Sequence, residues 1–195
     1  MTKIILAVII VLTIPLAAFL WYMGVFTTLI IGTEKSPHYW LVYEKIKGDY
    51  RQAGDSCGKV YTWLYANNIV TTKGFGIYYD NPQKTQKNEL RSIAGCILED
   101  KDIDKIEQIK QKFFVKEFFP VTSIKTTFPY KNKFSIFLGI FKAYPEIEKY
   151  TSKNNLLKNY TCSIEIYDEP NMTITYLAPV EPFMNFLDKY YNTEK

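Results

Sequence analysis

The sequence is poor in the residues that most often build metal sites and hydrolase triads. It contains one histidine, His38, and three cysteines, at positions 57, 96 and 162. The cysteines are odd in number, widely separated and without a Cys-x-x-Cys pair, so they predict neither a zinc site nor a disulfide framework. A single histidine disfavours a Ser-His-Asp or Cys-His hydrolase. We therefore expect no metal and no cofactor, and we assign no catalytic residue.

The sequence also has no large excess of positive or negative charge. The 24 basic and 20 acidic residues leave a net charge of only +4, and no dense basic stripe interrupts the chain. This balance disfavours a nucleic-acid partner, which would select a strongly basic face. With 47% hydrophobic and 16% aromatic residues, the composition is that of a folded protein. The chain is long enough for one domain of about 160 residues after its apolar N-terminal segment.

That N-terminal segment carries no charged residue from Ile4 to Gly32. As a helix it would reach about 43 Å, against a hydrocarbon core of roughly 30 Å. The apolar part of a cleaved signal peptide, the alternative, runs only about 7–15 residues. We therefore expect a single-pass transmembrane anchor over residues 1–32 and a linker at 33–37. Counting Lys and Arg on the two sides favours a cytoplasmic domain.

The periodicity of apolar residues predicts a mixed α and β domain after the linker. Gly95 is a candidate for a bulge, and Asp55 or Ser56 for a helix N-cap. The apolar residues Phe134, Phe137, Leu138 and Phe141 predict a helix packed on the core. The expected elements are a strand at 38–47, a helix at 56–68, strands at 71–79 and 90–98, a connector helix at 102–112, a strand at 118–128, the helix beginning near 133, strands at 162–168 and 171–178, and a terminal helix at 181–191.

The strand near the C-terminus alternates strictly. Ile164 and Ile166 point to one side of an extended chain, whereas Glu165 and Tyr167 point to the other. A half-exposed strand with a solvated glutamate is the simpler interpretation. The alternative is that the second side forms a site in which a carboxylate lies beside an aromatic ring.

A second copy of this stretch favours the alternative. Residues 75–82 share the Ile- and Tyr-rich run and end in Tyr-Asp-Asn-Pro, against Tyr-Asp-Glu-Pro at 167–170. In this alignment Tyr79 matches Tyr167, and Ile77 takes the place of Glu165. The repeat predicts a duplicated domain whose halves, about 38–98 and 113–180, meet around a pseudo-twofold axis.

Four motifs together resemble the GyrI-like domains, a small-molecule-binding family. They are Gly48-Asp49-Tyr50, the run from Gly76 to Pro82, the helix from Lys133 to Pro145, and Glu165-Ile166-Tyr167-Asp168. The resemblance covers residues 38–180, leaving 181–195 as a C-terminal helix and tail. It implies an α+β fold in which two strand-helix-strand-strand units form a curved antiparallel sheet. Helices would cover one side, and a ligand groove between the halves would lie on the other.

The resemblance also implies a site. Ile164 and Ile166 would face the helices, and Glu165, which matches the pocket acid of the family, would face the groove. Tyr167, Tyr79 and Tyr176 are the further candidates for ligand binding. A carboxylate in an aromatic groove loses hydration, so its pKa should rise. A cationic ligand would favour the ionised form, and each tyrosine ring would add roughly 0.5–2 kcal/mol of cation–π attraction.

Two other functions remain open at this point. Some GyrI-like proteins hydrolyse small molecules, and Glu165 could act as a general base toward water. The anchor and domain together also resemble animal endoplasmic-reticulum phagy receptors that join a transmembrane helix to a GyrI-like domain. This chain lacks the long disordered tail of those receptors, but the likeness supports a membrane-tethered adaptor with a protein partner.

Overall fold

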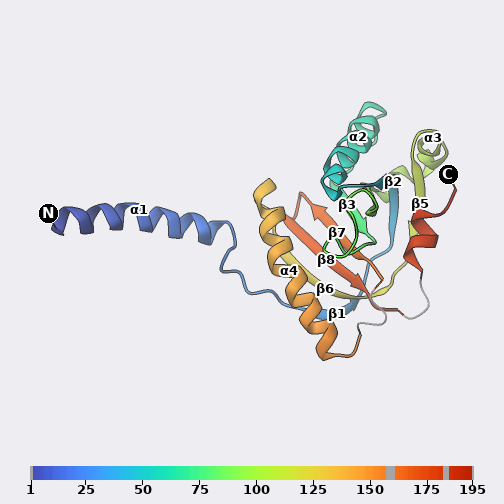
Figure 1. Ribbon diagram of the computed structural model, residues 1–195. Coiled ribbons are helices and arrows are strands. Elements are labelled where there is room, and N and C mark those ends of the chain that lie inside the picture. The colour runs from blue at the N-terminus through green and yellow to red at the C-terminus, as the bar shows by residue number, and fades with distance from the viewer. Residues whose placement is uncertain (1, 157–160, 182–184, 195) are drawn as a thin grey trace.

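The computed structural model describes residues 2–156, 161–181 and 185–194, with the backbone alone described for residues 2–10. Its centre is an eight-stranded antiparallel sheet with helices packed on it (Figure 1). The elements in chain order are α1 (Thr2–Tyr22), β1 (Gly32–Lys35), β2 (Tyr39–Lys47), η1 (Tyr50–Gln52), α2 (Ala53–Ala66), β3 (Lys73–Tyr78), β4 (Arg91–Leu98), η2 (Asp100–Lys105), α3 (Ile106–Lys110), β5 (Phe114–Phe118), β6 (Thr122–Pro129), α4 (Lys133–Lys153), β7 (Ser163–Asp168), β8 (Thr173–Pro179) and η4 (Leu187–Tyr191).

The strand order is nearly palindromic. It runs β1-β6-β8-β7-β3-β4-β2-β5, so that β6, β8 and β7 mirror β2, β4 and β3 about the central β7–β3 pair. Two strand-helix-strand-strand units meeting about a twofold axis would produce this order. The α+β class and the antiparallel sheet predicted from the sequence are confirmed.

Both long helices of the domain cover the same face of the sheet. Val60 and Leu64 of α2 pack against Val42 of β2 and Cys96 of β4. In the second half, Ala143 and Ile147 of α4 pack against Ile174, Tyr176 and Ala178 of β8. The cross-strand pairs place these sheet residues on the face that also carries Glu165.

The prediction of which face the helices cover was therefore wrong. Ile164 and Ile166 point away from α2 and α4 and pack with Phe75 and Ile77. Phe186 and Tyr190 of the C-terminal segment belong to the same cluster. Because the central strands are buried on both faces, the alternation of Ile with polar residues separated the faces without indicating which one lies under the helices.

Three local expectations are corrected by the pairing of strands. Gly95 forms no bulge, because β4 pairs with β2 in unbroken register from Trp40–Leu98 to Lys47–Arg91. The strand expected at 118–128 is two strands, β5 and β6, interrupted at Pro120 and paired with different partners. The linker expected at 33–37 contains most of β1, an exposed edge strand that lacks a hydrophobic pattern and pairs with β6.

The helix boundaries also differ from those predicted. Helix α2 begins at Ala53 and directly continues η1, whose N-cap is Asp49 rather than Asp55 or Ser56. Helix α4 continues through Pro145 to Lys153. Of the terminal helix predicted at 181–191, residues 182–184 lie outside the described part, and Leu187–Tyr191 forms a π-helical turn.

The apolar N-terminal segment is not one continuous helix. Helix α1 ends at Tyr22, Gly24 turns the chain with a φ of +81°, and the following residues lead without a helix to β1. Across the residues that the structure describes, no helix combines the length and the apolar character needed to span a bilayer. The transmembrane helix predicted over residues 1–32 is therefore not supported.

The apolar residues expected to pack α4 on the core lie mostly on its outer side. Phe134, Phe137 and Phe141 are exposed, and only Leu138 is partly buried against the core. Small residues make the contact with the sheet instead, in a row that comprises Ser135, Gly139 and Ala143 with the larger Ile147 and Thr151. Small side chains allow the helix backbone to approach the sheet closely, and this arrangement leaves the phenylalanines outside.

Candidate functional site

Glu165 lies in the middle of β7, beneath α4. Its side chain is only 2% exposed. The Tyr144 hydroxyl donates to Glu165 Oε1 at 2.7 Å, and the Tyr167 hydroxyl donates to Oε2. Both carboxylate oxygens thus accept a phenolic hydrogen bond, one from the helix and one from the same strand. This is how a buried acid is normally satisfied in the absence of a cation.

The start of α4 fixes the position of Tyr144. Asn132 caps the helix, because its Oδ1 accepts from the Phe134 amide at 2.9 Å. The Ser135 hydroxyl accepts in return from the Asn132 amide at 3.3 Å. This reciprocal capping box sets the first turn of the helix, and Tyr144 follows less than three turns later.

The neighbours of Glu165 across the strands are a glycine and a tyrosine. Glu165 pairs with Gly76 of β3 on one side and with Tyr176 of β8 on the other. A Cβ atom at Gly76 would lie 2.6 Å from the Tyr78 hydroxyl, so the glycine makes room for that ring beside the acid. The Tyr176 ring packs edge-on against Tyr144, with their centroids 5.8 Å apart.

The two halves contribute matching aromatic pairs around the acid. Tyr50 packs edge-on against Tyr78 in the first half, at a centroid distance of 4.8 Å. In the second half Tyr130 packs against Tyr167 at 6.1 Å. The Tyr78 and Tyr167 side chains also hydrogen-bond to each other. Glu165 therefore lies within a cluster of tyrosines drawn from both repeats and from α4.

Burial controls the protonation of these groups. Burial raises the pKa of Glu165 above its ordinary value, while the hydrogen bonds from Tyr167 and Tyr144 act in the opposite direction. Burial and the nearby Glu165 carboxylate both raise the pKa of Tyr78 and of Tyr167. The phenols therefore remain protonated donors, and Glu165 is the acid in this cluster, whose proton is held more tightly than that of an ordinary glutamate.

Several buried hydroxyls on this face lack a hydrogen-bond partner among the described residues. They are Ser92 Oγ, Thr126 Oγ1 and Tyr176 Oη. Each belongs to a strand residue on the face beneath α2 and α4. An unpaired buried hydroxyl costs roughly 1–3 kcal/mol, so these three hydroxyls are locally destabilising groups on the face that carries Glu165.

Tyr79 lies elsewhere. Its ring is on the opposite face, packed with the cluster that contains Ile164 and Ile166, and it contacts Tyr191 at a centroid distance of 5.8 Å. The structure thus brings Glu165, Tyr167 and Tyr176 together and places Tyr79 apart from them. The residue of the first repeat that approaches Glu165 is Tyr78, one position earlier.

A small apolar cavity also lies on the opposite face. Its volume is about 10 Å³, about enough for one water molecule. Its lining is formed by Tyr39, Leu41, Phe75, Ile77, Ile97, Phe118, Ile164 and Ile166. This cavity contains no charged side chain and is too small for an organic ligand.

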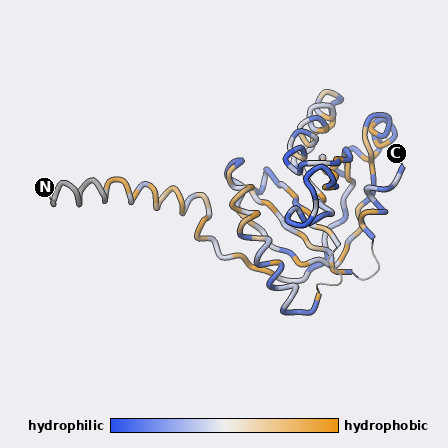
Figure 2. The backbone as a smooth tube through the Cα atoms, viewed as in Figure 1, coloured by the Kyte–Doolittle hydropathy of each residue, from blue (hydrophilic) through white to orange (hydrophobic). Residues whose placement is uncertain are grey.

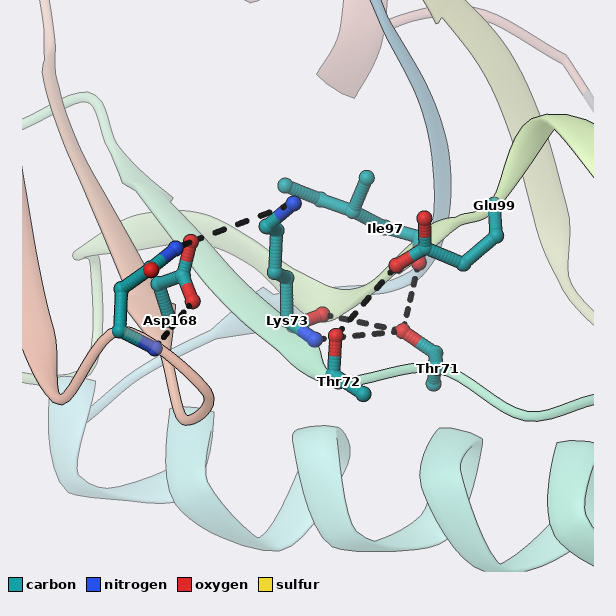
Figure 3. A network of polar contacts seen from close by, with 7 residues as sticks. Thr71, Thr72, Lys73, Ile97, Glu99 and Asp168 are labelled. Atoms are coloured by element: carbon teal, nitrogen blue, oxygen red, sulfur yellow. Dashed lines mark hydrogen bonds and ion pairs between the residues drawn. The ribbon is translucent and has the colours of Figure 1, made fainter.

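A polar network at the ends of β3 and β7 helps to hold the register that places Gly76 beside Glu165 (Figure 3). The Thr71 hydroxyl donates to the Ile97 carbonyl at 2.6 Å, which ties the chain before β3 to β4. Lys73 Nζ lies 3.9 Å from Asp168 Oδ2, which links β3 to β7. A slip of one residue would exchange the two faces of β3, so this register decides which tyrosine meets the acid.

Sequence reasoning missed Tyr78 and Tyr144. Aligning the sequences of the two repeats by their Tyr-Asp motif matched Ile77 with Glu165. In the sheet, the residue opposite Glu165 is Gly76. If the two repeats are instead aligned so that Gly76 matches Glu165, then Tyr78 matches Tyr167. The Gly-x-Tyr spacing at 76–78 against Glu-x-Tyr at 165–167 was the available signal. Tyr144 was missed because the phenylalanines before it were predicted to face the core, whereas the opposite side of α4 does so.

We expect wild-type stability to fall as the pH rises from the ordinary glutamate pKa to the raised pKa of Glu165. The native state binds this proton more tightly than the unfolded chain does. Each unit by which the folded-state pKa exceeds the unfolded-state pKa therefore lowers the free energy of unfolding by about 1.4 kcal/mol once the pH is above both values. Glu165→Gln cannot ionise and should lose this component, making it the more stable protein at the higher pH. Urea unfolding of both proteins between about pH 4 and about pH 8 measures the difference, and parallel pH profiles would contradict it.

No family profile matches the chain. Two curated relatives are similar to it over most of its length. Human testis-expressed protein 264 is 26% identical over 184 residues, which cover 87% of this chain and 54% of the relative. The mouse homolog is 27% identical over 174 residues, covering 84% and 52%. The chain therefore spans about half the length of these relatives.

Solved structures share the fold at much lower identity. The C-terminal domain of EcmrR superposes with a TM-score of 0.53 at 9% identity, covering 80% of this chain and 99% of that domain. A hydrolase from Listeria innocua gives a TM-score of 0.53 at 12% identity, covering 84% and 98%. The fold is thus GyrI-like, as the sequence resemblance implied.

Proposed function

We propose that this chain binds an apolar cationic small molecule against Glu165, on the sheet face that carries the tyrosine cluster. The observation that carries the proposal is a carboxylate, 2% exposed, that is hydrogen-bonded by the Tyr144 and Tyr167 hydroxyls and has no cationic partner among the described residues. A buried acid without a cationic partner is costly to keep ionised, and a bound cation would offset that cost. The GyrI-like fold, which this chain shares with ligand-binding domains, agrees with such a role.

Aromatic rings and unpaired hydroxyls would provide the rest of the binding energy. Tyr78, Tyr167 and Tyr176 lie near the acid, and a ring that meets a bound cation with its face would add roughly 0.5–2 kcal/mol of cation–π attraction. Tyr176 Oη has no hydrogen-bond partner among the residues described, and a ligand would reach it only if α4 moved away from the sheet. Because Tyr144 covers Glu165 from α4, a ligand that reaches the carboxylate has to replace the Tyr144 hydrogen bond. Since only a cationic group offsets the loss of that hydrogen bond, we expect the affinity for a ligand to depend on the ligand's charge more than on its shape.

The test compares two probes of similar shape and opposite charge, tetraphenylphosphonium and tetraphenylborate. We expect the chain to bind the cation and not the anion in titration calorimetry. Glu165→Gln should weaken cation binding by roughly ten- to a hundred-fold, because a charge-assisted contact is lost while the side-chain shape is kept.

Tyr79→Phe is the matched control, since Tyr79 lies on the other face and its hydroxyl should not matter. Equal affinity of wild type and Glu165→Gln for the cation would remove Glu165 from the site. Stoichiometric co-purification of one protein, without any bound small molecule, would instead favour the adaptor alternative.

A second part of the proposed function is attachment to a membrane through the N-terminal segment, with the domain on the cytoplasmic side. Support comes from the large apolar side chains of α1 from Val11 onward, most of which are exposed, with Trp21 at 74%. Figure 1 shows α1 extending away from the sheet, and Figure 2 shows its hydrophobic character. Water disfavours such an isolated apolar helix, and a bilayer would cover it. Flotation of the full chain with lipid vesicles is the direct measurement.

A further inference from the structure

The outer face of the first half of α4 is unusually apolar for a surface helix. Phe134, Phe137 and Phe141 are 52%, 57% and 77% exposed. Their spacing of three and four residues places them on one side of the helix, away from the buried row that includes Gly139 and Ala143. We call these three residues the α4 phenylalanine face.

The apolar character ends halfway along the helix. After Pro145 the exposed residues of α4 are charged or polar, and they include Glu146, Glu148 and Lys149. One end of the helix is therefore suited to an apolar environment and the other to water. A surface for a partner along the whole helix would not require this division.

The α4 phenylalanine face lies beside the end of α1. Lys142 Nζ of α4 donates to the Val25 carbonyl at 2.5 Å, and Asn132 Nδ2 contacts Met23 Sδ at 3.5 Å. The exposed side chains of Trp21 and Phe26 flank these contacts in the sequence. The apolar surface of the N-terminal segment thus continues onto the domain at the first half of α4.

The charges along this part of α4 are all positive. From Lys131 to Lys142 the chain contains three lysines and no aspartate or glutamate, the third being Lys133. Lys131 Nζ lies 5.6 Å from the centroid of the Tyr22 ring, which ties this basic rim to the end of α1. Lysines around aromatic side chains complement the anionic headgroups of a membrane, and each is worth roughly fivefold in affinity near such a surface.

We propose that the α4 phenylalanine face docks on the lipid membrane to which the N-terminal segment attaches. The phenylalanines would enter the boundary between headgroups and acyl chains, and Lys131, Lys133 and Lys142 would contact the headgroups. The domain is then held in one orientation, with the first half of α4 toward the lipid and the second half toward water. This inference rests on the proposed membrane attachment.

The experiment places a tryptophan on the face in the full chain. In a Trp21→Phe background, Phe137→Trp reports on the α4 phenylalanine face, and Tyr65→Trp on α2 is the matched control. Tyr65 is also an exposed aromatic residue, at 65%, on the other helix of the domain. With vesicles of phosphatidylcholine and about 30% phosphatidylserine carrying brominated acyl chains, Phe137→Trp should lose roughly half of its added fluorescence. Tyr65→Trp should lose none.

Charge reversal tests the basic rim. Adding Lys131→Glu and Lys133→Glu to Phe137→Trp should abolish the part of the quenching that depends on phosphatidylserine. Quenching unaffected by this change would contradict the role given to the lysines.

The outcomes separate this inference from the proposed function. If the full chain does not float with vesicles, membrane attachment itself fails and the docking fails with it. If the chain floats but the two tryptophans are quenched equally, docking is overturned and attachment stands. If light scattering shows dimers and Phe137→Trp is shielded without vesicles, a second copy covers the face, and docking on lipid is again overturned.

Discussion

Gly95→Ala is expected to lower the free energy of unfolding by about 4 kcal/mol or more, enough to prevent folding of a marginally stable domain. Gly95 lies in the interior of β4, between Tyr43 of β2 and Phe75 of β3. A Cβ atom here would lie 2.0 Å from the Val42 carbonyl oxygen and 2.8 Å from the Tyr43 Cα. Both are backbone atoms, so no side-chain rotation can relieve the overlap.

Gly74→Ala provides the matched control from the adjacent strand. Its added Cβ would lie 3.7 Å from the Gly95 carbonyl oxygen and 3.8 Å from the Tyr167 ring, which are ordinary contacts. We expect a change of less than about 1 kcal/mol in urea unfolding. Similar losses for both variants would show that the close approach of β2 to Gly95 is not what decides the outcome.

Gly139→Ala is expected to lower the free energy of unfolding by about 3 kcal/mol, the upper range for overpacking. Gly139 of α4 lies against the Tyr176 side chain. A Cβ atom there would be 2.1 Å from Tyr176 Oη and 3.0 Å from Tyr176 Cζ. Either α4 must lift from the sheet or the ring of Tyr176 must move. Urea unfolding of wild type and variant measures the loss.

Two further variants isolate the contact. Tyr176→Phe removes the overlapping hydroxyl, which has no partner among the described residues, so it should leave stability unchanged or raised and should recover part of the Gly139→Ala loss. Gly58→Ala on α2 meets no atom within 4 Å and should stabilise the helix by up to about 1 kcal/mol. A Gly139→Ala loss that persists fully in the Tyr176→Phe background would mean that the ring is not the obstacle.

The fold could be predicted from the sequence because its signals are local and repeated. The alternation at Ser163–Asp168 and the second copy in the first half predicted strands and a duplicated domain, and the resemblance to GyrI-like domains implied the antiparallel sheet. β1 was not predicted, because an edge strand that is held by backbone hydrogen bonds needs no pattern of apolar residues. Pro120 separates β5 from β6, and the sequence could not show that these strands pair with different partners.

The site was harder, because its composition depends on register and on helix packing. Glu165 stood out as the acid between Ile164 and Ile166, and Tyr167 follows from alternation alone. A shift of one residue between the repeats was enough to choose Tyr79 in place of Tyr78. Tyr144 joins the acid only because Gly139 and Ala143 let α4 approach the sheet, a tertiary effect that helical periodicity does not specify.

The near-palindromic strand order has a consequence for how a ligand would be oriented. At the middle of the sheet the two repeats meet through the pairing of β3 with β7, in which Gly76 of the first repeat lies opposite Glu165 of the second. A perfectly duplicated domain would hold a guest equally well in two opposite directions. Here the negative charge belongs to one repeat alone, so a molecule with a single cationic end should adopt one direction and a stoichiometry of one per chain.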